Sequence, residues 1–532
     1  MYMKKLAAAS TLAFGTFVTG GAQAAFPFDP VQVDLFLSGS SDVQNNLKGQ
    51  LSNLFIAGYK TASDSTTKNG AHFFAVTGTL KSAAPLPSVL WAKTARITYR
   101  TRGGSVWGVA PIAREEQIQW MKMDPTTCSI IVPPGATATA DYYCSPTGFD
   151  GGPNGRKADL GVSDVEPKMF KAPFNVELGK TQLNSAESNG LKSALVYQQV
   201  FGVPMTDVIP PSLVLTEAIV ESMLDNSGLM HDWKDVPGAP LSAINPGSPP
   251  NKDPVVVCRH VEGGQAIANH FFLHFPCGSP VPPARMVPGL GAGTADDPVI
   301  IDPTLGYTVV ENPSSGDVRS CLRAAQNGTN WTFVGDTGLW YQVTFSGTGR
   351  DTLNNIIHIN DDTTVVAPYG AVGVLSYDSA GKESGWHFHD LNGFLTLHAA
   401  NIAFSGRPAT STAKYALAAM MESPWEYFSE VTMQYRNGTN GKNALSDTPP
   451  AVNPATGNYS VGPLKTLADS LINILREPTN VNANLGNAAL PIFFTPVGPA
   501  SPTLNTNKVS KVSKVGDTCA KPKLFPPAPL FW

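Results

Sequence analysis

Short runs of alternating apolar and polar residues recur along the chain, and stretches with helical spacing separate them. The alternation predicts strands at 31–37 (VQVDLFL), 96–100 (RITYR) and 369–377 (YGAVGVLSY). Apolar residues three or four positions apart predict helices at 43–54, at 216–228, in the run that ends at Phe272, and at 464–474. This order of elements predicts an α/β fold with mixed sheets flanked by helices.

Stretches rich in Pro and Gly divide these elements into larger units. They predict loops near 131–156, 236–254, 276–303 and 437–463. We expect a first lobe, a second lobe, and a final part that returns to the first lobe and adds a C-terminal extension. The expected bounds of these three parts are 25–206, 207–375 and 376–532.

The first 24 residues have the features of a secretory signal. Lys4 and Lys5 precede a short apolar run, and Ala22-Gln23-Ala24 forms a cleavage pattern. The run is too short to span a bilayer, and no later segment reaches about 18 consecutive apolar residues. We therefore expect residues 1–24 to be a signal peptide, and the protein to be periplasmic or secreted with no membrane span.

The cysteines agree with an oxidising compartment. Their number is even, and none of the spacings forms a C-x-x-C metal or redox motif. Three disulfides are therefore predicted. Pairing each cysteine with its nearest neighbour gives Cys128–Cys144, Cys258–Cys277 and Cys321–Cys519.

Composition narrows the classes of protein. Charged residues make up 15% of the chain, against about 25% in an average soluble protein. A formal net charge of −4 argues against a nucleic-acid-binding protein, since that class carries a basic surface. The hydrophobic content of 42% excludes a disordered chain, because such chains have too few apolar residues to form a core.

Three segments share one pattern, in which a strand ends, a Gly/Ser cluster turns the chain, and a helix begins. They are 38–41 (SGSS), 103–105 (GGS) and 262–265 (EGGQ). Such turns and helix N-termini present backbone N–H groups, and Arg102 and Arg259 lie close to two of them in sequence. If the turns converge, they form a site for a small oxyanion.

The sequences of these motifs and their order along the chain resemble those of the periplasmic phosphate-binding proteins of ABC transporters. The segment 158–164 (ADLGVSD) resembles that family's DFGASDAP motif, and the chain from Val256 to Gly264 resembles its VVRRADGSGT motif. The segment 99–108 (YRTRGGSVWG) is similar to its phosphate loop. The resemblance covers about residues 31–400 and implies a two-lobed type 2 periplasmic binding-protein fold.

The resemblance also implies a set of ligand-binding residues between the lobes. Arg259 corresponds to the family's phosphate-clamping arginine, and Asp164 to its ligand-binding aspartate. An arginine gives an oxyanion two charged donors, whereas a carboxylate can only accept, so it favours hydrogen phosphate over fully ionised sulfate. The implied set is Ser40, Ser41, Gly104, Ser105, Asp164, Arg259, Gly263, Gly264 and Gln265.

Several positions depart from the family's pattern. Gly263 and Gln265 stand where the family has serine and threonine, which removes two hydroxyl donors, and Glu262 adds a negative charge. Trp107 is bulky and His260 can titrate. These departures fit a pocket for a ligand other than phosphate, or for none.

The sequence therefore predicts an exported solute-binding protein that holds phosphate or a related small oxyanion, without a cofactor or covalent chemistry. The resemblance implies an ABC permease as its membrane partner. One alternative is a secreted or surface-associated structural or adhesion protein on the same fold, favoured by the sparse charge and the missing donors. The other is a secreted hydrolase with a metal ion at His387 and His389, near His398 in the chain.

Overall fold

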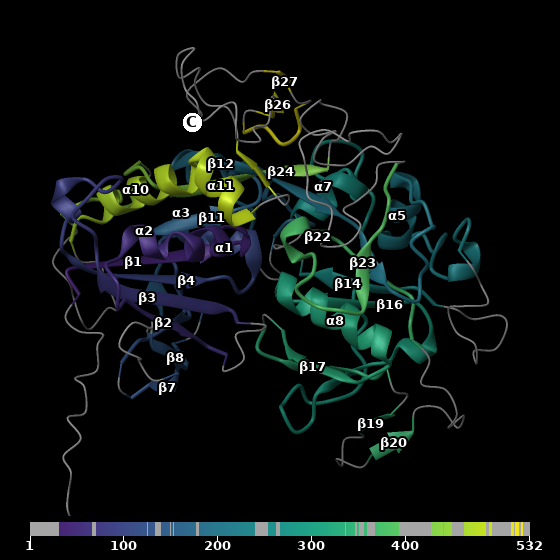
Figure 1. Cartoon of the computed structure of the whole chain (residues 1–532). Coiled ribbons are helices and arrows are strands. Elements are labelled where there is room, and N and C mark those ends of the chain that lie inside the picture. The colour runs from purple at the N-terminus through teal and green to yellow at the C-terminus, as the bar shows by residue number, and fades with distance from the viewer. Residues whose placement is uncertain are drawn as a thin grey trace, which may run out of the picture.

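The structure is a computed structural model in which two α/β lobes lie side by side. Figure 1 shows the first lobe in purple and blue, with the last helices in yellow, and the second lobe in teal and green. The residues that the structure describes are 31–65, 71–124, 126–132, 140–148, 150–152, 154–176, 180–239, 254–261, 266–335, 337–345, 348–350, 356–358, 368–392, 427–439, 441–448, 462–485, 489–491, 512–514, 516–520 and 523–524. The expected signal peptide lies outside them.

The first lobe is built on a large mixed sheet. Its centre is β1 (Val33–Gly39), which pairs in parallel with β4 (Thr94–Arg100) and with β11 (Leu160–Ser163). Antiparallel strands extend the sheet on both sides, so it is mixed, as predicted. Among the described residues its order is β22 (Leu375–Ser376), β12 (Leu191–Gly202), β24 (Phe428–Arg436), β11, β1, β4, β3 (Phe73–Thr79), β2 (Lys60–Ser63), β8 (Ala140–Cys144) and β7 (Cys128–Val132), with β25 (Ala489–Pro491) beside β12.

Helices from both ends of the described chain cover one face of this sheet (Figure 1). The apolar positions of α10 (Leu464–Arg476) pack on those of β1, because both elements carry their apolar residues at the period of their structure. The helix predicted over 43–54 is divided at Gln50 into two shorter helices. The other helices on this face are α1 (Asp42–Gly49), α2 (Leu51–Leu54) and α11 (Pro478–Leu485).

The second lobe is built on a smaller mixed sheet. Its centre is β14 (Val256–His260), which pairs in parallel with β16 (Thr308–Asn312) and β21 (Ala371–Gly373). Within the described residues its order is β16, β14, β21, β13 (Pro204–Thr206) and β23 (Trp386–Phe388). The helices of this lobe are α5 (Glu217–Leu224), α7 (Ala266–Leu273) and α8 (Ser315–Asn327).

The chain passes between the lobes through paired segments. Strand β12 of the first sheet continues across Val203 into β13 of the second, and β21 of the second continues across Val374 into β22 of the first. These two crossings, at 202–204 and 373–375, form the hinge of the molecule. The predicted lobe bounds stay a prediction; β23 lies in the second sheet and β24 in the first.

Local patterns predicted several elements well. Thr216 caps α5, and its hydroxyl accepts a hydrogen bond from the amide of Ile219 at 3.3 Å. The helix ends at Leu224, earlier than the predicted stop at Gly228. The predicted loop near 131–156 is wrong in part, because β7 and β8 pair as antiparallel strands there.

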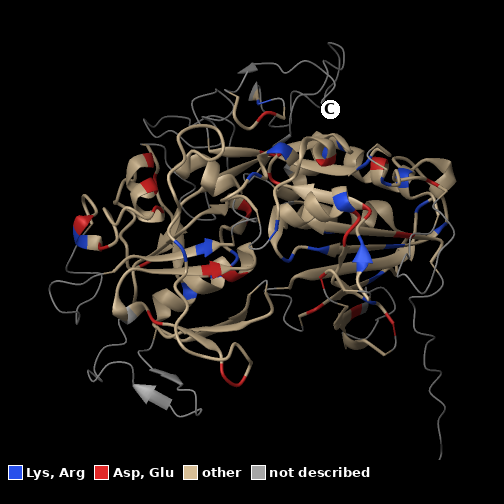
Figure 2. Ribbon diagram, turned by 180° about the vertical axis from the view of Figure 1, so that it is seen from behind, with Lys and Arg blue, Asp and Glu red and all other residues tan. Residues whose placement is uncertain are grey.

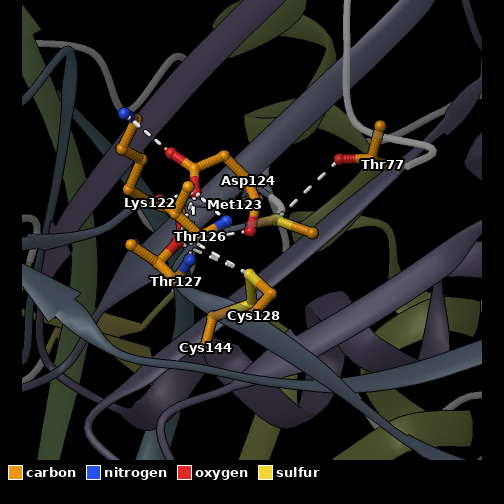
Figure 3. Close-up of a disulfide and its surroundings, with 8 residues drawn as sticks. All are labelled: Thr77, Lys122, Met123, Asp124, Thr126, Thr127, Cys128 and Cys144. Carbon is orange, nitrogen blue, oxygen red and sulfur yellow. Dashed lines mark hydrogen bonds and ion pairs between the residues drawn. A yellow bond between two sulfur atoms is a disulfide. The ribbon is translucent and has the colours of Figure 1, made fainter. Parts of the chain in front are cut away.

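A disulfide joins the paired strands β7 and β8. Cys128 and Cys144 are directly opposite one another, so the first predicted pairing is confirmed. Figure 3 shows the turn that precedes β7, where the carboxylate of Asp124 accepts hydrogen bonds from the amides of Thr126 and Thr127. This Asx-type turn directs the chain into the strand.

The other two predicted pairings are wrong. Cys258 pairs with Cys321 and not with Cys277, and Cys277 pairs with Cys519. The side chain of Cys258 faces α8, which packs on β14 and carries Cys321. Spatial order in the fold, and not distance along the chain, decides the pairing.

Charged side chains are thinly spread over both lobes, as Figure 2 shows. No helix among the described residues is both long and apolar enough to cross a bilayer.

Candidate functional site

A cavity lies between the two lobes, where parallel strands of both sheets end at their carboxyl side. Its lining residues leave about 490 Å³ of space between them, including open solvent at the mouth, and about 30 Å³ of this admits the centre of a water molecule. Ligands bind at this edge in open α/β sheets, because turns and helix N-termini from several strands meet there. The hinge adds an apolar wall, and the polar wall consists of Ser40, Ser41, Thr101, Asp164, His260, Ser314 and Ser315.

The first-lobe wall depends on three glycines that allow close backbone contact. Gly39 ends β1 with a φ of +130°, Gly108 ends the short 3-10 helix η2 (Gly104–Gly108), and Gly161 lies in β11. A Cβ atom on Gly39 or Gly108 would overlap the carbonyl oxygen of Val162, and one on Gly161 would overlap that of Gly108. The turns after β1, β4 and β11 therefore meet at a single wall.

Asp164 is the principal acceptor on this wall. Its Oδ2 accepts a hydrogen bond from the hydroxyl of Ser105 at 2.6 Å, and its amide donates back to Ser105 Oγ at 3.1 Å. The carboxyl is buried, and its Oδ1 has no hydrogen-bond partner among the described residues. Ser105 thus holds the carboxyl in place, and Oδ1 is left to accept a proton or N–H from a bound molecule.

The second-lobe wall supplies donors. Ser314 is the N-cap of α8: its hydroxyl accepts from the amide of Asp317 at 3.2 Å and lies 2.6 Å from Asp317 Oδ2. Ser315 begins the helix, so free backbone N–H groups of a 13-residue helix lie at the cavity. His260 ends β14 beside them, and its buried Nε2 has no partner within the described part of the chain.

Arg259 lies apart from this wall. Its guanidinium donates to Asn269 Oδ1 on α7 at 2.8 Å and to the carbonyl of Ala284 at 3.4 Å, and it is 2% exposed. Strand alternation explains this placement, since Cys258 faces α8 and Arg259 the opposite side. Asn269 in turn donates to the carbonyl of Phe174 in the first lobe at 2.9 Å. Arg259 therefore supports an interior network, and its predicted role as an anion ligand stays a prediction.

The structure brings together part of the predicted site. Ser40, Ser41, Gly104 and Asp164 line the cavity, and Ser105 lies directly behind Asp164. Gly263, Gly264 and Gln265 lie outside the described residues, as does the neighbouring Glu262.

The sequence analysis did not name three of the wall residues, Thr101, Ser314 and Ser315, and it named His260 only as a departure from the family's pattern. A signal for the α8 cap was present, because Ser314-Ser315-Gly316-Asp317 has the S-x-x-D pattern of a helix N-terminus. His260 carried a weaker signal, because strand alternation places it on the opposite side from Arg259.

Contacts between the lobes close the side of the cavity near β3. His72, which precedes β3, places Nε2 3.1 Å from Asp317 Oδ2 on α8, and its Nδ1 lies 3.8 Å from Asp64 Oδ2. The amide of Gly103 donates to the carbonyl of Pro313 at 3.3 Å. Burial lowers the pKa of His72, but the hydrogen bond to Asp317 and the charges of Asp317 and Asp64 raise it more, so its net pKa is raised. Burial raises the pKa of Asp317, but the interactions with His72 and the hydrogen bond from Ser314 lower it by more, so the net pKa is lowered.

These opposite shifts predict a pH window for this ion pair. The raised pKa of His72 gives stability that is complete below about pH 6.5 and is lost as pH rises through the folded-state pKa. The lowered pKa of Asp317 gives stability that is complete above about pH 4 and is lost as pH falls. We expect His72→Gln to lower the free energy of unfolding by about 1–3 kcal/mol at pH 5.5, and by clearly less at pH 9. Denaturant unfolding at both pH values measures this, and an equal loss at both would contradict it.

The paired histidines of the metal alternative lie on β23. The rings of His387 and His389 stack with centroids 4.5 Å apart, and His387 Nδ1 is 2.8 Å from Asp207 Oδ1. No group of three or more potential metal-ligating side chains gathers among the described residues, and His398 lies outside them. Around His387 and His389 the described residues therefore form no group of three side chains that could hold a metal ion, which the hydrolase alternative would require.

The fold and the cavity define a two-lobed α/β protein with a polar cavity between its sheets. By structure the chain is similar to an ABC-type phosphate transport receptor from Vibrio cholerae, with 9% identity, coverage of 85% of this chain and 98% of that chain, and a TM-score of 0.34. It is also similar to PstS from Borrelia burgdorferi (10% identity, 87% and 99% coverage, TM-score 0.30) and to a high-affinity periplasmic phosphate-binding protein bound with phosphate (12% identity, 86% and 90% coverage, TM-score 0.31). No family model and no curated protein matches the sequence. The chemistry of the cavity therefore rests on its own residues.

Proposed function

We propose that this protein reversibly binds a small oxyanion of the phosphate class in the cavity between its lobes. The observation that carries the proposal is the combination of an unpartnered acceptor, Asp164 Oδ1, with hydroxyls and a helix N-terminus on the facing wall. The two lobes would close on the ligand by motion at the hinge. The reaction is binding alone, with no bond made or broken.

The donors suit an oxyanion because they are mostly neutral. The free N–H groups at the start of α8 can donate to a ligand oxygen, and so can the hydroxyls of Ser41 and Ser315. The hydroxyls of Thr101 and Ser314 already donate to the carbonyl of His72 and to Asp317 Oδ2. Helix N-termini favour negative charge, and an imidazole such as His260 adds a stronger donor when it is protonated. In the structure the guanidinium of Arg259 donates to Asn269 and to the carbonyl of Ala284, so the neutral groups are the donors of this proposal.

The acceptor gives the site its selectivity. An ionised carboxylate at Asp164 repels an oxyanion that carries no proton, but accepts a hydrogen bond from one that does. Hydrogen phosphate and hydrogen arsenate carry such a proton at neutral pH, whereas sulfate does not. We therefore propose phosphate or arsenate in preference to sulfate.

Titration calorimetry of the purified protein with phosphate, arsenate and sulfate tests this function. We expect phosphate and arsenate to bind at least tenfold more tightly than sulfate. Asp164→Asn should narrow that preference to less than about threefold, because the amide can donate to sulfate. Asp207→Asn, on an exposed side chain in contact with His387, is the matched control and should change nothing. If none of the three anions gives heat with the wild-type protein, the proposal is wrong.

We also propose that this protein is exported and delivers its bound ligand to an ABC permease. Its support is the signal-like N-terminus together with the two-lobed architecture. Fractionation of cells that express the full chain tests the export, with the processed protein expected outside the cytoplasm. Retention of the unprocessed chain in the cytoplasm would contradict it.

The structural or adhesive alternative has one observation in its favour. Three aliphatic side chains at the outer part of the second lobe are largely exposed, namely Val287 (82%), Leu290 (79%) and Leu305 (75%). Exposed apolar groups on a weakly charged surface favour contact with another macromolecule. This candidate becomes the preferred one if the titrations give no anion binding and the purified protein is retained on an immobilised partner.

A further inference from the structure

A short segment near the C-terminus returns to the body of the protein and contacts both lobes. It comprises residues 512–514 and 516–520, which we refer to as the strap. Figure 1 shows its first strand, β26 (Val512–Ser513), beyond β24 and α7. Two buried carboxylates of the first lobe, Glu430 and Glu166, accept hydrogen bonds from the strap, and the exposed Asp517 lies 3.3 Å from Lys168 Nζ.

Glu430 holds the first half of the strap. It lies on β24 and is 4% exposed. Its Oε1 accepts from the hydroxyl of Ser513 at 2.6 Å and the amide of Lys514 at 2.8 Å, and its Oε2 accepts from the amide of Gly516 at 2.9 Å. A buried carboxylate that accepts several hydrogen bonds holds its donors firmly, since its charge strengthens each bond and losing them would leave it uncompensated.

Glu166 holds the second half. It follows β11 in the first lobe and is 2% exposed. Its Oε1 accepts from the amide of Thr518 at 2.9 Å, and its Oε2 accepts from the hydroxyl of the same residue. Thr518 is therefore bound to the first lobe at two atoms.

The next residue is bonded covalently to the second lobe. Cys519 forms a disulfide with Cys277, which follows α7. The loop that carries Cys277 is tied to the second lobe on both sides, since the amide of Val281 donates to Leu273 and that of Ala284 donates to Leu224 of α5. The bonds of Arg259 to Asn269 and to Ala284 add to this attachment.

We propose that the strap is an additional connection between the lobes, and that it limits how far they separate at the hinge. Adjacent residues are held by different lobes, so the slack between the two attachments is one peptide unit, about 3.8 Å between Cα atoms. Wider separation at this point requires Thr518 to leave Glu166, which would strip a buried carboxylate of two donors. The lobes can therefore adjust by a few ångströms without cost to the strap, but larger opening requires its release.

Hydrogen exchange of the full chain tests the strap without any ligand. The probes are the amide of Gly103, which donates across the lobes to Pro313, and the first turn of α8. In a double variant with Cys277→Ser and Cys519→Ser we expect exchange at these amides to accelerate at least tenfold, and the radius of gyration in solution scattering to increase. A double variant with Cys128→Ser and Cys144→Ser is the matched control, because it removes a disulfide within the first lobe alone.

A second variant separates strap length from loss of the disulfide. Insertion of Gly-Ser-Gly between Thr518 and Cys519 leaves every partner in place and adds up to about 10 Å of reach. We expect it to accelerate exchange at the same amides as the first double variant does. Exchange rates in the insertion variant equal to those of the wild type would overturn the proposal, even if the double variant failed to fold. Because no anion is present, this result is independent of whether the cavity binds phosphate.

Discussion

Asp34→Asn is expected to lower the free energy of unfolding by about 3–5 kcal/mol. Asp34 is the second residue of β1 and is 1% exposed. Its carboxylate accepts from Arg96 at 2.6 and 3.1 Å, and from Arg156 Nη1 at 3.0 Å. The amide of asparagine would remove the carboxylate that both buried guanidinium groups share, and Arg156 would keep only its longer ion pair with Asp159 at 3.4 Å.

The pKa of Asp34 gives the same conclusion. Burial raises it, but the charges of Arg156 and Arg96 and their hydrogen bonds lower it more, so the net pKa lies below its usual value. The ion pairs of Asp34 therefore contribute stability at neutral pH that is lost as pH falls through the folded-state pKa.

Denaturant titration at pH 7 measures the loss of stability in Asp34→Asn. Glu116→Gln, which breaks a looser ion pair with Arg114 at 3.8 Å, is the control and should cost less than about 1 kcal/mol. A similar loss in the free energy of unfolding in both variants would show that the buried ion pairs of Asp34 stabilise the protein no more than the looser ion pair of Glu116 does.

Gly161→Ala is the second substitution with a large expected effect, about 3 kcal/mol of stability. The added methyl group would overlap the carbonyl oxygen of Gly108 and press on Ile112. Backbone atoms cannot give way as a flexible side chain can, so the η2 turn must move away from β11. That turn carries Gly104 and Ser105 to the cavity wall, and we expect phosphate affinity to fall at least tenfold as well.

Gly278→Ala is the matched control for this steric argument. Gly278 does not have a positive φ, and an added Cβ would meet His274 at an ordinary 3.5 Å. Thermal unfolding should show little change for this variant and a large decrease for Gly161→Ala. Equal melting temperatures would contradict the close-packed glycine contact, and a lower melting temperature with unchanged affinity would separate the fold from the site.

The parts of the fold that were predicted correctly are those set by neighbours in sequence. The alternation in β1 and β4, the Thr216 cap and the apolar stripe of α10 are local patterns, and each was visible in the chain. The disulfides of Cys258, Cys277 and Cys321 were not predictable in this way, because they depend on which helix packs on which strand.

The candidate site shows the same division. Glycine and serine after a strand singled out the turn at Ser40, and the resemblance singled out Asp164; both residues line the cavity. The direction of Arg259 was not predicted, since it depends on which side of β14 faces the cavity. The donors on α8 came from a segment that the resemblance did not single out, although its cap pattern was present in the sequence.

The position of β24 determines how the protein can be divided. This strand comes from residues 428–436, yet it lies between β11 and β12 inside the first sheet. The second-lobe strands β13, β14, β16, β21 and β23 therefore lie in sequence between two neighbouring strands of the first sheet. A fragment that stops at residue 206 would lack an internal strand and expose two unpaired edges, so it should aggregate rather than fold. The first sheet can close only after the chain has passed through the second lobe and come back, which makes the two lobes one folding unit with slow, non-local strand pairing.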